Sequence, residues 1–247
     1  MNLKISYPIL ILLSTAAFSQ DQKQPIEQIT VTAARASQNI LDVAGNTGWL
    51  NDESLRLIEH QHINQALVRI PGSWISRGNG QEHLTAIRSP VLTGAGGCGA
   101  FFIAQDGISL RAPGFCNVNQ LFDTNTEQAS SLEVVRGPAS TMYGSNAVHG
   151  VINVLTPNPL DIEQSSLSLS IGPHDYSRGM FSLTTKTKQH SFLFYGNVTK
   201  DGGFLDDSGF DQQKFNLIHH YQDGKWQIKN VLAVTNLNQE TAGFTSG

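Results

Sequence analysis

The sequence has few charged residues, only two cysteines, and no long run of hydrophobic residues. Charged residues make up 15% of its 247 residues, below the roughly 25% that is usual in soluble domains. The 16 Lys and Arg against 20 Asp and Glu give a net charge of −4, with no basic cluster. Because phosphate recognition needs clustered Lys and Arg, we expect no nucleic-acid partner. No stretch reaches the about 18 consecutive apolar residues of a membrane-spanning helix, which excludes a helical bundle but not a β-barrel.

Residues 1–19 have the layout of a secretory signal peptide. A start that carries Lys4 precedes a mostly apolar stretch and then a run of small residues. Ala17 and Ser19 fit positions −3 and −1 of a cleavage site, so we expect the mature chain to begin at Gln20.

Export would place the two cysteines in an oxidising compartment, where disulfides form. We predict that Cys98 and Cys116 pair there, which contributes about 3 kcal/mol in the chain-entropy model. Two free thiols or a metal site are the alternatives. The segment between the cysteines has no His, and two Cys are only half of a structural zinc site.

The mature chain divides into three zones. Residues 20–40 include an alternating segment at 26–33 that we expect to be an unpaired strand, free to add to another sheet. Residues 41–157 mix short strands with helical periodicity, which predicts a compact α+β domain with a small mixed sheet. Residues 161–247 hold alternating segments of roughly ten residues, joined by Gly- and Asp-rich turns.

Within the second zone, residues 53–70 carry apolar side chains at three- and four-residue spacings. This pattern predicts one helix, ended by Pro71 and Gly72. An Asp106-Gly107 turn is also predicted. Short strands are predicted at 83–88, 100–104, 108–110, 132–136 and 151–156.

In the third zone the side chains alternate between an apolar and a polar face. Phe192, Phe194 and Val198, for example, oppose Ser191 and Asn197. Transmembrane barrel strands have this pattern, apolar toward lipid and polar toward the lumen. A soluble meander with one wet face has the same period, so periodicity alone does not choose between them. The signal peptide favours the first antiparallel strands of a transmembrane β-barrel.

A long motif at residues 131–156 is the most specific feature of the chain. It reads S-L-E-V-V-R-G-P-A-S-T-M-Y-G-S-N-A-V-H-G-V-I-N-V-L-T. This stretch resembles the end of the plug domain of TonB-dependent outer-membrane receptors, which is approximately I-E-x-I-E-V-[VI]-R-G-P-x-S-x-x-Y-G-x-x-A-x-x-G-V-I-N-I-[IV]-T. Residues 63–72 resemble the earlier plug helix that leads into P-G-V. Residues 26–33 resemble the TonB box.

The resemblance implies a transport protein rather than an enzyme. It implies ligand-gated, TonB-energised import of a scarce siderophore-, cobalamin- or glycan-like nutrient across the outer membrane of a Gram-negative bacterium. The implied partners are TonB, with ExbB–ExbD in the inner membrane, a small extracellular ligand and outer-membrane lipid. The TonB-binding residues would be Ile26, Glu27, Gln28, Ile29, Thr30, Val31, Thr32 and Ala33.

The family pattern also suggests which residues face the ligand. The family has I-R-G where this chain has Ile87-Arg88-Ser89, and a Gly-rich, Cys-containing insert follows where family members have loops facing outward. The expected ligand-side residues are Arg77, Gly78, Asn79, Gly80, Gln81, Gly94, Gly96, Gly97, Gly99, Phe115 and Asn117. By the same resemblance, Arg136 of the R-G-P motif is expected to contact the barrel wall.

Other motifs carry less weight. Gly94, Gly96 and Gly99 spell a dinucleotide fingerprint, but a strand-like segment follows instead of a helix, so we expect no nucleotide cofactor. The pairs His60/His62 and His219/His220 have no third ligand at zinc spacing, so we expect no metal and place these side chains toward solvent or the lumen.

Two rival functions remain. One is a free-standing exported plug-like binding module without transport, and the other is an exported hydrolase, which the missing nucleophile signature disfavours. Only 87 residues follow Leu160, whereas a plugged barrel has about 22 strands. We therefore expect the chain to be truncated.

Overall fold

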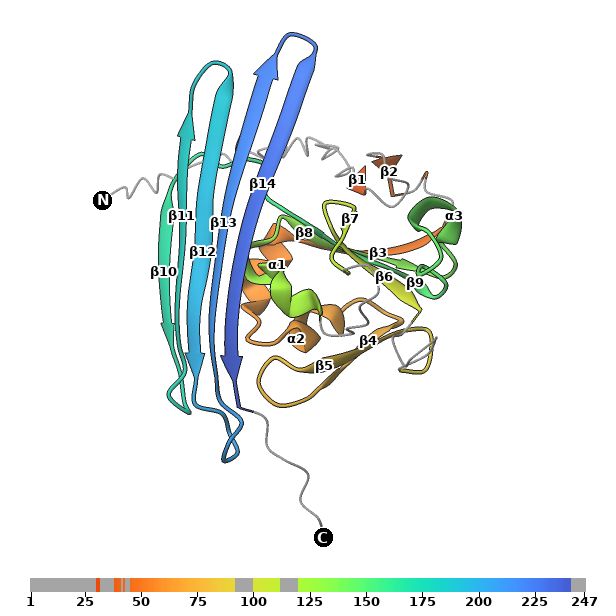
Figure 1. Ribbon diagram of the computed structural model, residues 1–247, viewed down its shortest axis with the longest axis vertical. Helices are drawn as coiled ribbons and strands as arrows, with labels where there is room; N and C mark the ends of the chain where they lie inside the picture. The colour runs from red at the N-terminus through yellow and green to blue at the C-terminus, as the bar shows by residue number, and fades with distance from the viewer. Residues whose placement is uncertain are drawn as a thin grey trace, which may run out of the picture.

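The computed structural model describes residues 30–31, 38–40, 42, 45–91, 100–111 and 120–240. They form an N-terminal domain, residues 45–157, and a five-stranded antiparallel sheet, residues 166–239, here called the wall (Figure 1). The N-terminal domain lies against one face of the wall. None of the helices in these ranges has both the length and the apolar character needed to span a membrane.

The N-terminal domain is built on a mixed five-stranded sheet in the order β3-β8-β9-β6-β7. Its strands are β3 (Asn46–Asn51), β6 (Phe101–Gln105), β7 (Ile108–Ser109), β8 (Ser131–Arg136) and β9 (Gly150–Leu155). The β6–β9 pair is parallel and the other pairs are antiparallel. A separate hairpin pairs β4 (Ser73–Arg77) with β5 (His83–Ile87). These strands and the Asp106-Gly107 turn confirm the α+β prediction.

Short helical elements complete the domain. They are α1 (Asp52–Ile58), α2 (Ile63–Leu67), α3 (Ser140–Tyr143) and the 3-10 turns η2 (Gln120–Asp123) and η3 (Thr126–Gln128). Leu55 and Leu67 from the first two helices pack in one buried cluster with Ile87, Leu132 and Ile152. Burial of side chains of this size contributes roughly 1.5–3 kcal/mol each.

The single helix predicted at 53–70 is wrong, because caps interrupt the apolar pattern. Glu59 ends α1 in the left-handed conformation, with φ 45°. The Nδ1 of His62 then accepts a hydrogen bond from the Asn64 amide (3.1 Å), and the His62 amide donates to Gln65 Oε1 (3.2 Å). Such a reciprocal cap begins a new helix.

The wall consists of five strands that each pair with the next along the chain. They are β10 (Ser166–Ile171), β11 (Ser177–Lys186), β12 (His190–Asp201), β13 (Phe210–Asp223) and β14 (Trp226–Gln239). The longer connections, 172–176 and 202–209, lie at one end of the wall, here called the loop end, at the bottom of Figure 1. The short connections, 187–189 and 224–225, lie at the opposite end.

The predicted alternation of faces is confirmed. Phe192 and Phe194 of β12 are exposed on the outer face. Ser191, Asn197 and Thr199 alternate with them on the inner face and are buried. The polar face of the wall is therefore the one that receives the N-terminal domain.

Candidate functional site at the interface between domain and wall

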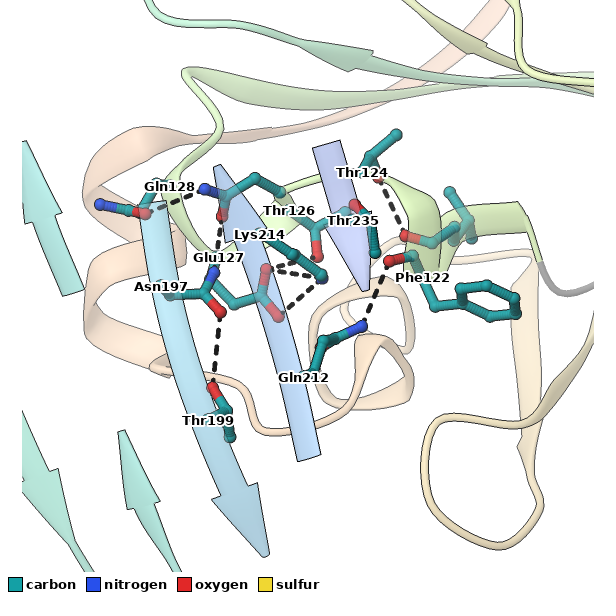
Figure 2. A network of polar contacts seen from close by, with 12 residues as sticks. Phe122, Thr124, Thr126, Glu127, Gln128, Asn197, Thr199, Gln212, Lys214 and Thr235 are labelled. Carbon is teal, nitrogen blue, oxygen red and sulfur yellow. Dashed lines mark hydrogen bonds and ion pairs between the residues drawn. The ribbon is translucent and has the colours of Figure 1, made fainter. Parts of the chain in front are cut away.

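The centre of the interface is an ion pair between η3 and β13. Lys214 Nζ lies 3.0 Å from both carboxylate oxygens of Glu127, and the two side chains are only 2% and 4% exposed (Figure 2). Burial alone raises the pKa of Glu127, but the attraction of Lys214, with smaller contributions from His60 and Arg178, outweighs it and holds the pKa at about 2. Glu127 is therefore ionised at neutral pH.

Hydrogen bonds on either side of this pair tie residues 122–128 to four wall strands. The carbonyl of Asp123 accepts from Thr235 Oγ1 (2.8 Å), and the Oδ1 of Asn125 accepts from Asn197 Nδ2 (3.0 Å). Gln128 Nε2 donates to the Phe181 carbonyl (2.9 Å). Gln212 Nε2 also donates to the Phe122 carbonyl (3.3 Å) (Figure 2). This segment thus meets the wall through polar contacts.

A second group of polar contacts, centred on Asp106, joins the domain to the wall at the end opposite the loop end. Asp106 accepts hydrogen bonds from the amide (3.0 Å) and the hydroxyl (2.7 Å) of Thr156. Lys229 Nζ of β14 lies 3.2 Å from the same carboxylate. Asp106 in this turn therefore holds Thr156, where the chain leaves the N-terminal domain, and also holds Lys229 of β14.

At the loop end the domain and the wall together line a cleft of about 180 Å³. Arg77, Gly78 and Gly80 come from the β4–β5 connection, while the facing residues come from both longer wall connections. Those facing residues are Pro173, His174, Asp201, Gly203, Phe204, Ser208 and Phe210, and Gln61 completes the lining. The cleft thus combines a guanidinium, a carboxylate, an imidazole and two phenyl rings.

Buried histidines hold the β4–β5 connection in place. His62 Nε2 donates to the Glu82 carbonyl (3.1 Å), and His83 Nδ1 donates to the Gln81 carbonyl (3.0 Å). Burial lowers the pKa of His62 to about 3 and that of His83 to about 4, so both rings are neutral at pH 7. The expectation that His60 and His62 face solvent or the lumen is wrong, because both are at most 1% exposed. The sequence pattern around these two histidines did not predict that their side chains are buried.

The predicted ligand-side residues fall into two groups. Arg77, Gly78 and Gly80 line the cleft. Gln81 is buried behind it, where its Nε2 donates to the Gln61 carbonyl (3.0 Å) and its amide donates to Gln239 Oε1 (3.0 Å). Asn79 lies in the same connection. Gly94, Gly96, Gly97, Gly99, Phe115 and Asn117, like the pair Cys98 and Cys116, lie outside the described residues.

Two further predicted sites are only partly described. Of residues 26–33, Thr30 and Val31 form β1 (Thr30–Val31), which pairs antiparallel with β2 (Gln38–Asn39). The expectation of an unpaired strand is therefore wrong for these two residues, because the chain folds back on itself at 38–39. Arg136 donates to the carbonyls of Asn46 and Pro71 inside the N-terminal domain. Burial, with repulsion from Arg88, lowers the pKa of Arg136. Its contact with a barrel wall stays a prediction.

Sequence reasoning missed the residues that make the ionic contacts between the domain and the wall. A signal was present for Lys214, because it shares the two-residue period of Asn216 on the inner face. Glu127 gave no local signal, since its partner lies 87 residues away in the sequence.

Comparison with known proteins gives a consistent result. The family model described as TonB-dependent Receptor Plug Domain matches residues 39–151. The vitamin B12 transporter BtuB of Vibrio vulnificus (strain CMCP6) is 28% identical over 202 residues, which cover 81% of this chain and 31% of BtuB. An iron-regulated outer membrane virulence protein of Vibrio cholerae is 29% identical over 161 residues, or 62% of this chain and 23% of that protein. The chain therefore spans about a third or less of these relatives.

Solved structures share the fold. The pyoverdine outer membrane receptor FpvA of Pseudomonas aeruginosa PAO1, bound to pyoverdine, matches with a TM-score of 0.70 at 13% identity, covering 83% of this chain and 30% of FpvA. The siderophore receptor PirA of Pseudomonas aeruginosa matches with a TM-score of 0.57 at 23% identity, covering 80% of this chain and 36% of PirA. At such identities the likeness concerns the fold alone.

Proposed function

Because this chain belongs to the TonB-dependent receptors, with its plug domain at residues 39–151, we propose that it serves ligand-gated, TonB-energised import. The chain is an outer-membrane protein of a Gram-negative bacterium, and its relatives are receptors and transporters rather than enzymes. The cargo we propose is a scarce nutrient of the siderophore, cobalamin or glycan type.

The observation that carries this proposal is the cleft at the loop end. Long loops of such barrels face the outside and short turns face the periplasm, so this cleft opens toward the external medium. Its lining is shared between the N-terminal domain and the wall. A ligand that binds there contacts both parts at once and therefore favours any arrangement in which both contacts improve.

The polar interface suits such a rearrangement. Residues 122–128 meet the wall through hydrogen bonds and one ion pair. Water can replace contacts of this kind at modest net cost, typically about 0.5–1.5 kcal/mol for each hydrogen bond. The N-terminal domain can then shift against the wall without exposing its own apolar core.

The coupling to energy would run through residues 26–33. This segment would add as a strand to TonB, which ExbB–ExbD drives from the inner membrane. Strand addition needs main-chain amides that are free to pair. The β1–β2 pairing at Thr30 and Val31 would then have to open first.

The test separates binding from transport in the full-length receptor that contains this chain. A Val31→Pro variant removes a main-chain donor from the proposed TonB box, and Gln22→Pro is the matched control outside it. Cells are offered radiolabelled cyanocobalamin and a panel of ⁵⁵Fe-loaded siderophores. We expect Val31→Pro to keep surface binding of the accepted probe but to lose uptake, while Gln22→Pro keeps both.

Two results would contradict the proposal. Undiminished uptake by Val31→Pro would remove the role of residues 26–33. Recovery of the protein in the soluble periplasmic fraction with ligand bound would support the rival binding module. We also propose that Cys98 and Cys116 are paired; a thiol titration of the denatured, unreduced protein that finds both thiols free would refute this pairing.

A further inference from the structure

A second and larger cleft separates the N-terminal domain from the wall. Its volume is about 900 Å³, and it runs between α1 and η3 on one side and strands β10–β12 on the other. Ser168, Met180 and Tyr195 line it from the wall, and Glu59 and His60 line it from the domain. This cleft shares no lining residue with the one at the loop end, and the linings of the two clefts are consecutive in sequence at one place.

That place is the connection between α1 and α2, residues 59–61. His60 lines the large cleft, while the next residue, Gln61, lines the cleft at the loop end. The backbone of this connection therefore lies between the two clefts. Glu59 enters this connection in the left-handed conformation (φ 45°), a backbone state that non-glycine residues adopt only when their surroundings hold them there.

The wall holds this connection through one buried arginine. Arg178 of β11 is 3% exposed. Its Nη1 donates to the His60 carbonyl (2.8 Å), and its Nε donates to Thr199 Oγ1 on β12 (3.1 Å). A second contact joins Ser170 of β10 to the carboxylate of Glu59.

The other side of the connection is tied to the loop end. The Gln61 carbonyl accepts a hydrogen bond from Gln81 Nε2 (3.0 Å), and Gln81 follows directly on the residues that line the smaller cleft. A displacement of residues 77–81 by a bound ligand therefore reaches residues 59–61 through one hydrogen bond. The connection is thus held by the wall on one side and by the proposed ligand-side loop on the other.

We propose that the two clefts are parts of one transport path along β10–β12, that residues 59–61 are its gate, and that Arg178 is the positioning residue that keeps the gate shut. This inference rests on the proposed import function. It assigns the path to the side of the N-terminal domain that faces β10–β12, where the wall contributes Arg178, rather than to the side that faces β13 and β14.

The charges along the path predict which ions it favours. Of the charged residues that line the large cleft, Asp52 pairs with Arg56, and Glu127 pairs with Lys214 from outside the lining. The carboxylates of Glu59, Asp161 and Glu163 then outnumber the guanidinium of Arg178. A path with excess negative charge concentrates cations, so the open gate passes K⁺ in preference to Cl⁻.

The test uses conductance, which needs neither ligand nor TonB. The full-length receptor is inserted in planar lipid bilayers under a KCl gradient, and Arg178→Met is compared with the wild type. Lys229→Met is the matched control, because it deletes another basic contact between wall and domain, at Asp106, outside both clefts. We expect Arg178→Met to open about tenfold more often, as the loss of a charged hydrogen bond implies, with a K⁺-selective reversal potential.

Several results would overturn the gate. They are an Arg178→Met variant as closed as the wild type, equal leakage in Lys229→Met, or a Cl⁻-selective current. Should Arg178→Met fail to insert, Ser170→Ala removes only the contact with Glu59 and should raise the opening frequency by a smaller factor; no rise would again overturn the gate. Because uptake is measured separately with Val31→Pro, failure of the gate and failure of the import function are distinguishable.

Discussion

Glu127 and Lys214 form an ion pair that is sealed between the N-terminal domain and the wall, with Lys214 Nζ equidistant, at 3.0 Å, from both carboxylate oxygens. Removal of two charges from water costs several kcal/mol for each ion, and only close pairing offsets that cost. The pair therefore specifies where residues 122–128 sit on the wall more than it stabilises the protein.

Breaking one half of this pair should be worse than removing both. We expect Lys214→Met to leave Glu127 buried without its cation and to lower the free energy of unfolding by about 3–5 kcal/mol. The double variant Glu127→Leu/Lys214→Met should be close to the wild type. Urea unfolding of the full-length receptor, followed by tryptophan fluorescence, measures both. Additive losses in the double variant would contradict this account.

Two variants at Asp106 separate the contribution of its negative charge from that of its hydrogen bond to the Thr156 amide. Asp106→Asn keeps an oxygen acceptor for the Thr156 amide but loses the attraction to Lys229, which is 36% exposed. We expect a loss below about 1 kcal/mol, as is usual for exposed pairs. Asp106→Ala should cost more and should speed hydrogen exchange at the Thr156 amide. Equal exchange rates in the two variants would show that this amide does not depend on Asp106.

A pair of glycine variants isolates the contact at the loop end. Gly80 and Gly107 have positive φ, 54° and 77°, so alanine strains the backbone at both. A Cβ at Gly80 would also lie 2.9 Å from Gln239 Oε1, whereas nothing lies within 4 Å at Gly107. Since Gln239 holds the Gln81 amide, we expect Gly80→Ala to weaken binding of the accepted uptake probe several-fold and Gly107→Ala to leave it unchanged. Equal affinity in both variants would remove residues 77–81 from the ligand site.

Acid should destabilise the N-terminal domain through its buried histidines. Burial lowers the pKa of His62 to about 3 and the pKa values of His60 and His83 to about 4. The unfolded chain binds these protons below about pH 6.5, whereas the folded domain does not. The free energy of unfolding is therefore highest above pH 6.5. It falls as the pH is lowered toward 4, by up to about 1.4 kcal/mol per pH unit for each histidine.

The measurement is the urea midpoint at several pH values. His83→Gln removes one titrating group, so its midpoint should depend less steeply on pH between 6.5 and 4. A slope equal to that of the wild type would mean that His83 is not held neutral by burial.

Much of the fold follows from local sequence patterns. The two-residue alternation at 191–198 placed Phe192 outward and Asn197 inward, and the structure agrees. The Asp106-Gly107 turn was also predictable, because few residue pairs adopt positive φ at two successive positions. Such signals act within a few residues of one another, so the sequence carries them whatever the rest of the chain does.

The caps at 59–62 were harder to predict. Glu59 and His62 interrupt a helical pattern that is continuous in its apolar positions. A left-handed glutamate and a histidine cap are uncommon choices, so apolar spacing alone favoured one helix.

The sequence by itself determined the family motif, the α+β character of the N-terminal domain, several of its strands and the facing of the wall strands. Only the tertiary structure decided which distant groups meet: Glu127 with Lys214, Arg178 with the His60 carbonyl, and Gln81 with Gln239. Periodicity fixes the face on which a side chain lies, but a contact between two elements also requires their relative height and tilt. Those quantities come from packing the whole N-terminal domain against the wall, and no local segment encodes them.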